Sequence, residues 1–152
     1  MKARDIAIQV PTVTLGDSIA HAIQVMALGR LPGLIVMDDA GRPRVVLPGT
    51  QVLRLAVPAA YQDDPALTRT VDEAHADVFW HEIRDRTVGA CLGTHSPRPV
   101  VVKASATLLE LATVMAKQRC PLAAVVDESG QLAGAVTLDR LLSALALTRP
   151  DD

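Results

Sequence analysis

The sequence predicts an α+β fold built from two similar β-α-β-β-α repeats. Two observations support this prediction most strongly: the pattern of residues 107–142, and the return of that pattern 89 positions earlier. A third is composition, since hydrophobic residues make up 49% of the 152 residues while aromatic residues make up only 2%. We therefore expect an aliphatic core within a chain of single-domain length.

Residues 107–142 predict a helix, two strands and a second helix in that order. Thr107 and Glu110 have the spacing of a capping box, which begins a helix. Pro121 cannot continue that helix, and the apolar run 122–126 that follows suits a buried strand. A turn and a second strand over 133–138 then lead into a helix rich in leucine.

The same pattern over residues 18–53 predicts a first repeat without gaps. Ser18 aligns with Thr107, Pro32 with Pro121, and Leu53 with Leu142. An offset shared by helix, proline, strands and turn indicates a duplicated unit. The first repeat is therefore expected to hold a helix at 19–28, strands at 34–37 and 44–47, and a closing helix at 50–57.

Residues 58–86 have no counterpart within the repeats. Asp63, Asp64 and Pro65 suit a helix start, because acidic side chains and proline favour the first turn. Apolar spacing from Val71 onward extends this to about 20 residues of helix. Because this predicted helix carries Phe79 and Trp80, two of the three aromatic residues of the chain, we expect it to be a packing element and an oligomer contact.

Charge and cysteine content exclude several classes of function. A net charge of -2 gives no electrostatic basis for binding nucleic acid or an anionic membrane. Cys91 and Cys120 lack a CxxC spacing, which favours a reducing cytoplasm without disulfides. No apolar run approaches the roughly 20 residues that cross a bilayer, so no direct membrane insertion is expected. Metal and catalytic motifs are missing from the sequence, so neither metal-binding nor catalytic residues are assigned.

The repeats resemble a tandem pair of CBS domains, also called a Bateman module. The resemblance lies in the opening at 88–92, the capped helix that follows, the PLAAVVDESG run with its strand LAGAVT, and the closing LL helix. It covers nearly all of the chain outside 58–86. In the first repeat, Val45 and Pro48 stand where the second repeat has Gly134 and Thr137.

The resemblance implies a first CBS motif at 1–58, a connecting helical segment at 59–86, a second CBS motif at 87–148 and a tail at 149–152. It further implies that the repeats pack through their sheets as a pseudo-symmetric pair with two clefts between them. Such pairs commonly form homodimers and bind AMP, ADP, ATP or S-adenosylmethionine. They usually regulate a separate protein such as an enzyme or transporter and catalyse nothing themselves.

The resemblance places the first cleft at Gly29, Arg30, Thr137, Asp139 and Arg140. Nucleotide-binding members tend to carry Gly-x-x-Thr-x-x-Asp, whose aspartate accepts hydrogen bonds from the ribose hydroxyls. Here Asp139 lies one position early and Arg140 takes the ribose position. A nucleotide would then meet Thr137, with Arg30 or Arg140 facing its phosphates.

The second cleft is expected at Thr50, Gln51, Gln118 and Arg119, and its motif is degenerate because Pro48 replaces the threonine. Each of the candidate residues also has a purely structural interpretation. Thr137 can cap the following helix, Asp139 and Arg140 can form a solvated first turn, and Arg30 and Arg119 can be surface charges favoured at helix ends.

We therefore predict a regulatory pair that binds an adenosine-type ligand and modulates a partner protein. The alternative is a ligand-free interaction or dimerisation module with degenerate clefts. A hydrolase or metal-dependent enzyme is a third hypothesis, but no residue pattern supports it.

Overall fold

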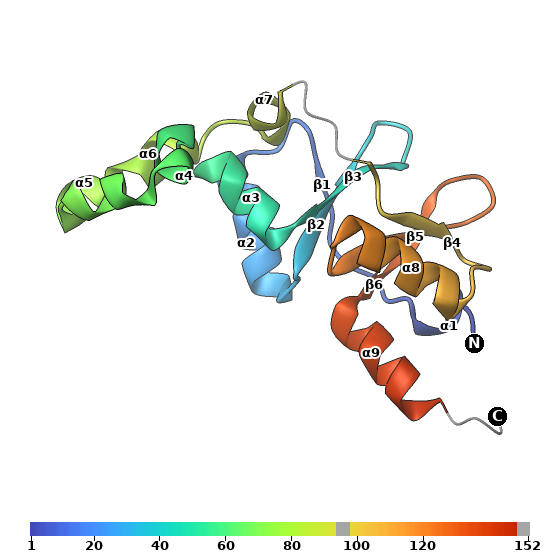
Figure 1. The fold of residues 1–152 in the computed structure, drawn as a ribbon. Helices are drawn as coiled ribbons and strands as arrows, with labels where there is room; N and C mark the ends of the chain where they lie inside the picture. Colours follow the sequence, from blue (N-terminus) through green and yellow to red (C-terminus); the bar gives the residue numbers. More distant parts are fainter. Residues whose placement is uncertain (94–97, 149–152) are drawn as a thin grey trace.

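The computed structural model describes residues 1–93 and 98–148, and it contains two three-stranded sheets flanked by helices (Figure 1). The tail predicted at 149–152 lies outside the described residues. No helix among those described is long and apolar enough to cross a membrane. The mixed α+β architecture predicted from the repeats is confirmed.

The first repeat contains β1 (Val13–Thr14), α2 (Ile19–Gly29), β2 (Gly33–Met37), β3 (Pro43–Pro48) and α3 (Gly49–Ala56). The second contains β4 (Val101–Lys103), α8 (Leu108–Gln118), β5 (Leu122–Val126), β6 (Leu132–Thr137) and α9 (Leu138–Leu147). In each sheet the first strand is parallel to the second, and the second is antiparallel to the third.

The two sheets have the same register at an offset of 89 residues. Leu34 pairs with Leu47 in the first sheet, and Ala123 pairs with Val136 in the second. A register shift occurs in both sheets, between Val36 and Met37 and between Val125 and Val126. The internal repeat seen in the sequence is therefore confirmed at the level of individual strand pairs.

Sequence-local hydrogen bonds explain why both repeats turn at the same places. The hydroxyls of Ser18 and Thr107 accept from the backbone N–H three residues later and begin α2 and α8. In the strand turns, Asp38 and Asp127 each accept from the backbone of the residues two and four positions on. These side chains supply the hydrogen bonds that the backbone of the turn lacks.

The opening segments of the two repeats are exchanged. The segment with α1 (Ala3–Ile6) packs on the second repeat, where Ala3 N–H donates to Ala106 and Ile8 exchanges two 2.8 Å backbone hydrogen bonds with Ala135. Conversely, α7 (Val88–Leu92) packs on the first repeat, where Val88 N–H donates to Asp17. The domain boundaries at 1–58, 59–86 and 87–148 stay a prediction. In the folded protein, each repeat packs against the opening segment that belongs in sequence to the other repeat.

Two aliphatic cores reflect this exchange. The larger contains the second repeat together with Ala3 and Ile6, and the smaller contains the first repeat together with Val88. Ile35 and Val46 from the first sheet also belong to the larger core, so the two sheets pack against each other. Burial at about 25 cal/mol per Å² of apolar surface favours this arrangement.

The expectation of about 20 residues of continuous helix between the repeats is wrong. The segment instead forms α4 (Ala59–Asp63), a 3-10 helix η1 (Pro65–Thr70), α5 (Glu73–Ala76) and α6 (Val78–Ile83). Asp64 and Asp72 each cap a new helix with their side chains, which divides the segment at those points. The apolar residues do recur at helical spacing, but the capping side chains of Asp64 and Asp72 start new helices and so prevent one continuous helix.

Candidate functional site

Thr137 stands at the end of β6 and caps α9. Its Oγ1 accepts from the backbone N–H of Arg140 at 3.3 Å, and its side chain is half-buried. One lone pair of the hydroxyl is used in this way, while the O–H proton and the second lone pair stay available to a ligand. The structural interpretation of Thr137 and the ligand-binding one are therefore compatible.

Arg140 ties the second repeat to the N-terminal segment. Its Nε donates to the backbone carbonyl of Ile6 at 2.7 Å, in a partly buried position. The resemblance puts a ribose-binding aspartate at this position, whereas a guanidinium has no acceptor atoms. Arg140 therefore cannot bind ribose hydroxyls as an aspartate does, and part of its hydrogen-bonding capacity is already used within the protein. Ile6 lies 134 residues away in sequence, and no sequence signal reveals the contact.

Residues 6–11, which we call the N-terminal strip, connect the two sides of the first predicted cleft. At one end Ile6 contacts Arg140, and Ile8 pairs with Ala135. At the other end Pro11 lies 3.6 Å from where a Cβ on Gly29 would stand. The strip therefore extends from the Thr137–Arg140 corner to the corner formed by Gly29 and Arg30.

Gly134 allows the N-terminal strip to lie directly on β6. A Cβ at this position would stand 3.1 Å from the carbonyl oxygen of Ile8 and 3.2 Å from the Cβ of Ala7. Both distances are tighter than most Cβ contacts, so a side chain here would require the strip to shift by a few tenths of an ångström. The glycine of the Gly-x-x-Thr sequence thus has a definite steric role in this fold.

Arg30 and Arg119 occupy equivalent corners in an unusual conformation. Their φ angles are 51° and 50°, and each ends its helix in the left-handed region. Glycine is the usual residue at such positions, and a side chain there costs roughly 1–2 kcal/mol. Both arginines are exposed, and neither guanidinium has a hydrogen bond or carboxylate partner among the described residues.

Not all candidate residues line the same hollow. Asp139 and Arg140 line a hollow of about 490 Å³ between α1 and α9, together with Asp5, Ile6 and Ser143. Arg30 and Thr137 do not line it. In the second set, Thr50 and Gln51 lie in the first turn of α3 and Gln118 ends α8. Arg119 lines a different hollow, of about 390 Å³, between α8 and α9.

The cysteines are separate free thiols. Cys120 is buried, its Sγ donates to the carbonyl of Leu122, and burial raises the pKa of its thiol. Such a thiol stays protonated above its ordinary range, and only a thiolate is an effective nucleophile. Cys91 is half-buried and lies within α7. Within residues 1–93 and 98–148, no group of three histidine, cysteine or acidic side chains is arranged to hold a metal ion.

Comparison with known proteins identifies the family. The CBS domain profile matches residues 91–147. A CBS domain-containing protein of unknown function from Kribbella flavida is 42% identical, with a TM-score of 0.78 over 96% of this chain and 99% of that one. The chain therefore belongs to the CBS-domain proteins, as a tandem CBS module. The chain has no significant match among curated proteins.

Two more distant structures share the fold. CBSX2, which is from Arabidopsis thaliana, is 22% identical in its complex with AMP, with a TM-score of 0.66 over 97% of this chain and 98% of that one. The cytosolic domain of the Mg²⁺ channel MgtE, in complex with ATP, is 20% identical with a TM-score of 0.57. This match covers 89% of the present chain and 44% of the MgtE chain.

Replacing Arg140 by alanine should loosen the N-terminal strip without unfolding the protein. Loss of the hydrogen bond to Ile6, worth on the order of 1–2 kcal/mol, should speed amide exchange at Ile8 and Ala135 by roughly 5–30-fold. Native-state hydrogen exchange measures this, with Ser143→Ala as the control, because Ser143 lines the same hollow while the side-chain hydrogen bond to Ile6 comes from Arg140. Unchanged exchange in Arg140→Ala would show that the contact does not hold the strip.

Proposed function

We propose that this tandem CBS module binds an adenosine-type ligand and thereby regulates a partner protein, an enzyme or transporter, without catalysing a reaction itself. The ligand classes are AMP, ADP, ATP or S-adenosylmethionine. The proposed site comprises Gly29, Arg30, Thr137, Asp139 and Arg140. Free thiols at Cys91 and Cys120 support a role in the reducing cytoplasm.

The conformation of Arg30 is the observation that carries the proposal. A non-glycine residue held at positive φ costs stability, and such strain tends to gather at functional positions. Arg30 is also exposed and has no ionic partner among the described residues. A planar guanidinium in this state suits a phosphate, to which it can donate two parallel hydrogen bonds.

The known complexes support the class of ligand. CBSX2 was solved with AMP and the MgtE cytosolic domain with ATP. Because Arg140 replaces the ribose-binding aspartate, we expect the nucleotide to bind through its phosphates, with Arg30 and Arg140 as donors. Thr137 would contribute its free hydroxyl proton.

Regulation would follow from competition for Arg140. A phosphate that draws its guanidinium away would weaken the 2.7 Å hydrogen bond to Ile6. The N-terminal strip, which belongs to the opening of the first repeat, would then be held less firmly on the second repeat. A ligand shifts the equilibrium between the held and the released strip only if its affinity differs between these two arrangements. The Arg140–Ile6 contact supplies that difference, because Arg140 is free to bind phosphate only when the strip is released.

An adenosine nucleotide should stabilise the protein, and Arg30→Gly should reduce that effect to about half or less. At 100 times its Kd a ligand adds about 2.7 kcal/mol, a melting shift of roughly 5–10 °C. Arg30→Gly relieves strain at positive φ, so the free protein should be unchanged or more stable by up to about 1 kcal/mol. Nucleotide affinity should nevertheless fall about 10–100-fold, because a charge-assisted hydrogen bond is lost.

Thermal shift with AMP, ADP, ATP and S-adenosylmethionine, followed by calorimetry, measures both effects. Arg44→Ala, an exposed arginine on β3, is the control for net charge. No stabilisation by any of the four ligands at millimolar concentration would contradict the proposal and favour a ligand-free interaction module. The internal use of Arg140 and the proline at position 48 are the observations that favour that second candidate.

We further propose that the module forms a homodimer through α8 and α9. Leu138, Leu142 and Leu145 share one face of α9 and are 41%, 52% and 44% exposed. They line the apolar hollow of about 390 Å³ between the two helices. An exposed apolar patch of this kind marks an association surface, and a second copy would cover it.

Leu142→Asp should convert the dimer to a monomer with little change in the fold, because the side chain is half exposed. Light scattering during size-exclusion chromatography at micromolar concentration reports the mass. Leu147→Asp is the matched control, since Leu147 lies near the end of the same helix and lines the other hollow. A wild-type protein that is already monomeric would rule out the dimer.

A further inference from the structure

Residues 59–86, which we call the arm, project from the first repeat away from the second sheet (Figure 1). None of α4, η1, α5 and α6 contains a buried residue. Trp80 and Ile83 pack against the first-repeat core and attach the arm. Helices this short are marginal alone, because their ordering entropy is not offset by burial. A surface that covers the arm would provide that burial.

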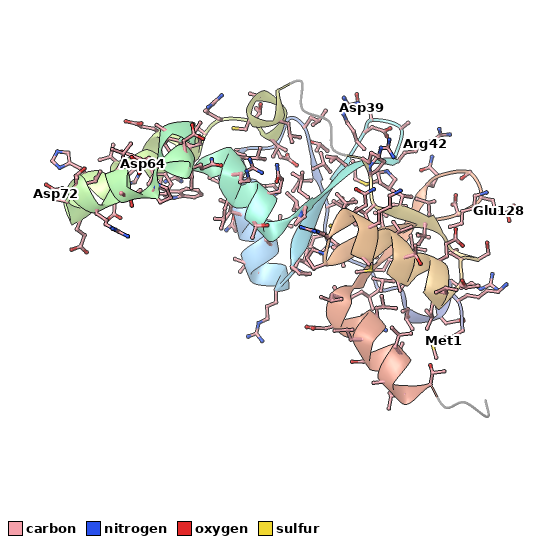
Figure 2. All side chains as sticks on the ribbon, viewed as in Figure 1. Met1, Asp39, Arg42, Asp64, Asp72 and Glu128 are labelled. Carbon is pink, nitrogen blue, oxygen red and sulfur yellow. The ribbon has the colours of Figure 1, made fainter. Side chains whose placement is uncertain are left out.

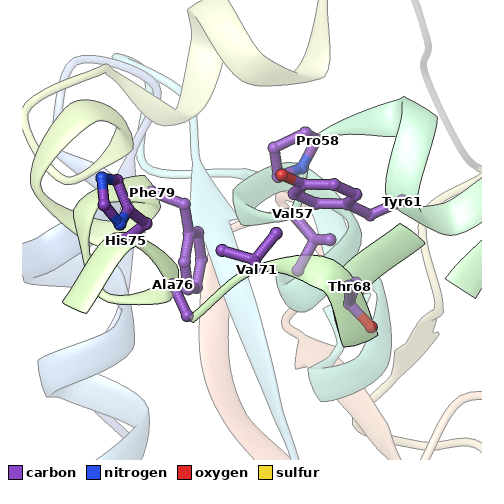
Figure 3. A pocket seen from close by; sticks show the side chains of 8 residues that line it. All are labelled: Val57, Pro58, Tyr61, Thr68, Val71, His75, Ala76 and Phe79. Atoms are coloured by element: carbon purple, nitrogen blue, oxygen red, sulfur yellow. The ribbon is translucent and has the colours of Figure 1, made fainter. Parts of the chain in front are cut away.

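A small apolar pocket lies between the start of the arm and its later helices α5 and α6 (Figure 3). Its volume is about 240 Å³, and its walls include Val57, Pro58, Tyr61, Val71, Ala76 and Phe79. Cofactor and drug-sized sites usually exceed about 300 Å³. The pocket is therefore better suited to an anchor side chain of a protein partner, which is how hot-spot residues bind.

The arm is strongly acidic. It contains seven acidic residues against three arginines, a net charge of -4, whereas the rest of the chain carries +2. The acidic residues, all exposed, are Asp63, Asp64, Asp72, Glu73, Asp77, Glu82 and Asp85.

Most of this negative charge is not neutralised within the chain. Among the described residues, only Asp72 and Asp85 have a cationic group or histidine within 4.0 Å. Asp72 lies at the outer part of the arm (Figure 2), where hydrogen bonds from the backbone and ring of His75 lower the pKa of its carboxyl. The Asp72 carboxylate therefore stays ionised at a lower pH than an ordinary aspartate. It lies next to His75, which lines the pocket.

We propose that the arm docks a basic segment of the regulated protein, with one large apolar side chain in the pocket and lysine or arginine on either side of it. Acidic charge around an apolar pocket complements this sequence chemistry and repels nucleic acid and anionic membranes. A second copy of this chain is a poorer match, because its remaining residues carry only +2. The partner is the regulated protein of the proposed function, so the proposal rests on that function.

Three synthetic peptides without tryptophan test the docking chemistry. The first places phenylalanine between clusters of arginine, the second replaces the phenylalanine by alanine, and the third replaces the arginines by glutamate. Calorimetry measures binding, and emission from Trp80 reports on the arm, because it is the one tryptophan in the chain. We expect the first peptide to bind at least 10-fold more tightly than the others, and to weaken as salt is raised.

Ala76→Leu and Ala74→Leu form a matched pair on α5. Ala76 lines the pocket and Ala74 is exposed outside it. Filling the pocket with leucine should weaken binding of the first peptide at least 10-fold, while Ala74→Leu should leave it unchanged.

Three results would overturn the docking proposal: no binding of the first peptide at millimolar concentration, equal binding of the acidic peptide, or equal affinity in the two leucine variants. Trp80 emission that changes with protein concentration alone, and loses this dependence in Ala76→Leu, would assign the arm to a second copy instead. The peptide experiments contain no nucleotide. Their outcome is therefore independent of whether the cleft binds a nucleotide, which the thermal-shift experiment tests separately.

Discussion

The fold depends on the exchange of opening segments between the two repeats. Ile8 and Ala135 exchange a pair of backbone hydrogen bonds, and Val88 donates to Asp17 in the reciprocal contact. Each core therefore contains side chains from the other repeat's opening. Neither repeat can complete its core without the other half of the chain. This constraint also brings the N-terminal strip to Arg140, where a ligand would act on both repeats at once.

The sequence predicted the parts of the fold that depend on local patterns. The caps at Ser18 and Thr107 and the 89-residue offset all reappear in the structure. The exchange was not predicted, because α1 and α7 are short and similar, and pairing between distant segments has no local signal. The single long helix was also wrong, since apolar spacing in the arm does not reveal where Asp64 and Asp72 restart the chain.

The candidate site was predicted to a similar extent. The capping role of Thr137 was one of two interpretations open from the sequence, and the geometry is compatible with both. The left-handed conformation of Arg30 is a property of the folded backbone, and the contact between the Arg140 side chain and the Ile6 carbonyl joins distant parts of the chain; no motif encodes either. Together they convert a departure from the family's ribose motif into a specific proposal, in which phosphates and the protein's own strip compete for one arginine.

Native-state amide hydrogen exchange in two mild core variants tests most directly whether each opening segment packs on the other repeat. Ala3→Gly should reduce protection of the second sheet, β4 to β6, although residue 3 belongs in sequence to the opening of the first repeat. Val88→Ala should reduce protection of the first sheet, β1 to β3, because Val88 is fully buried in that core. The opposite assignment, with Ala3→Gly loosening the first sheet and Val88→Ala the second, would contradict the account.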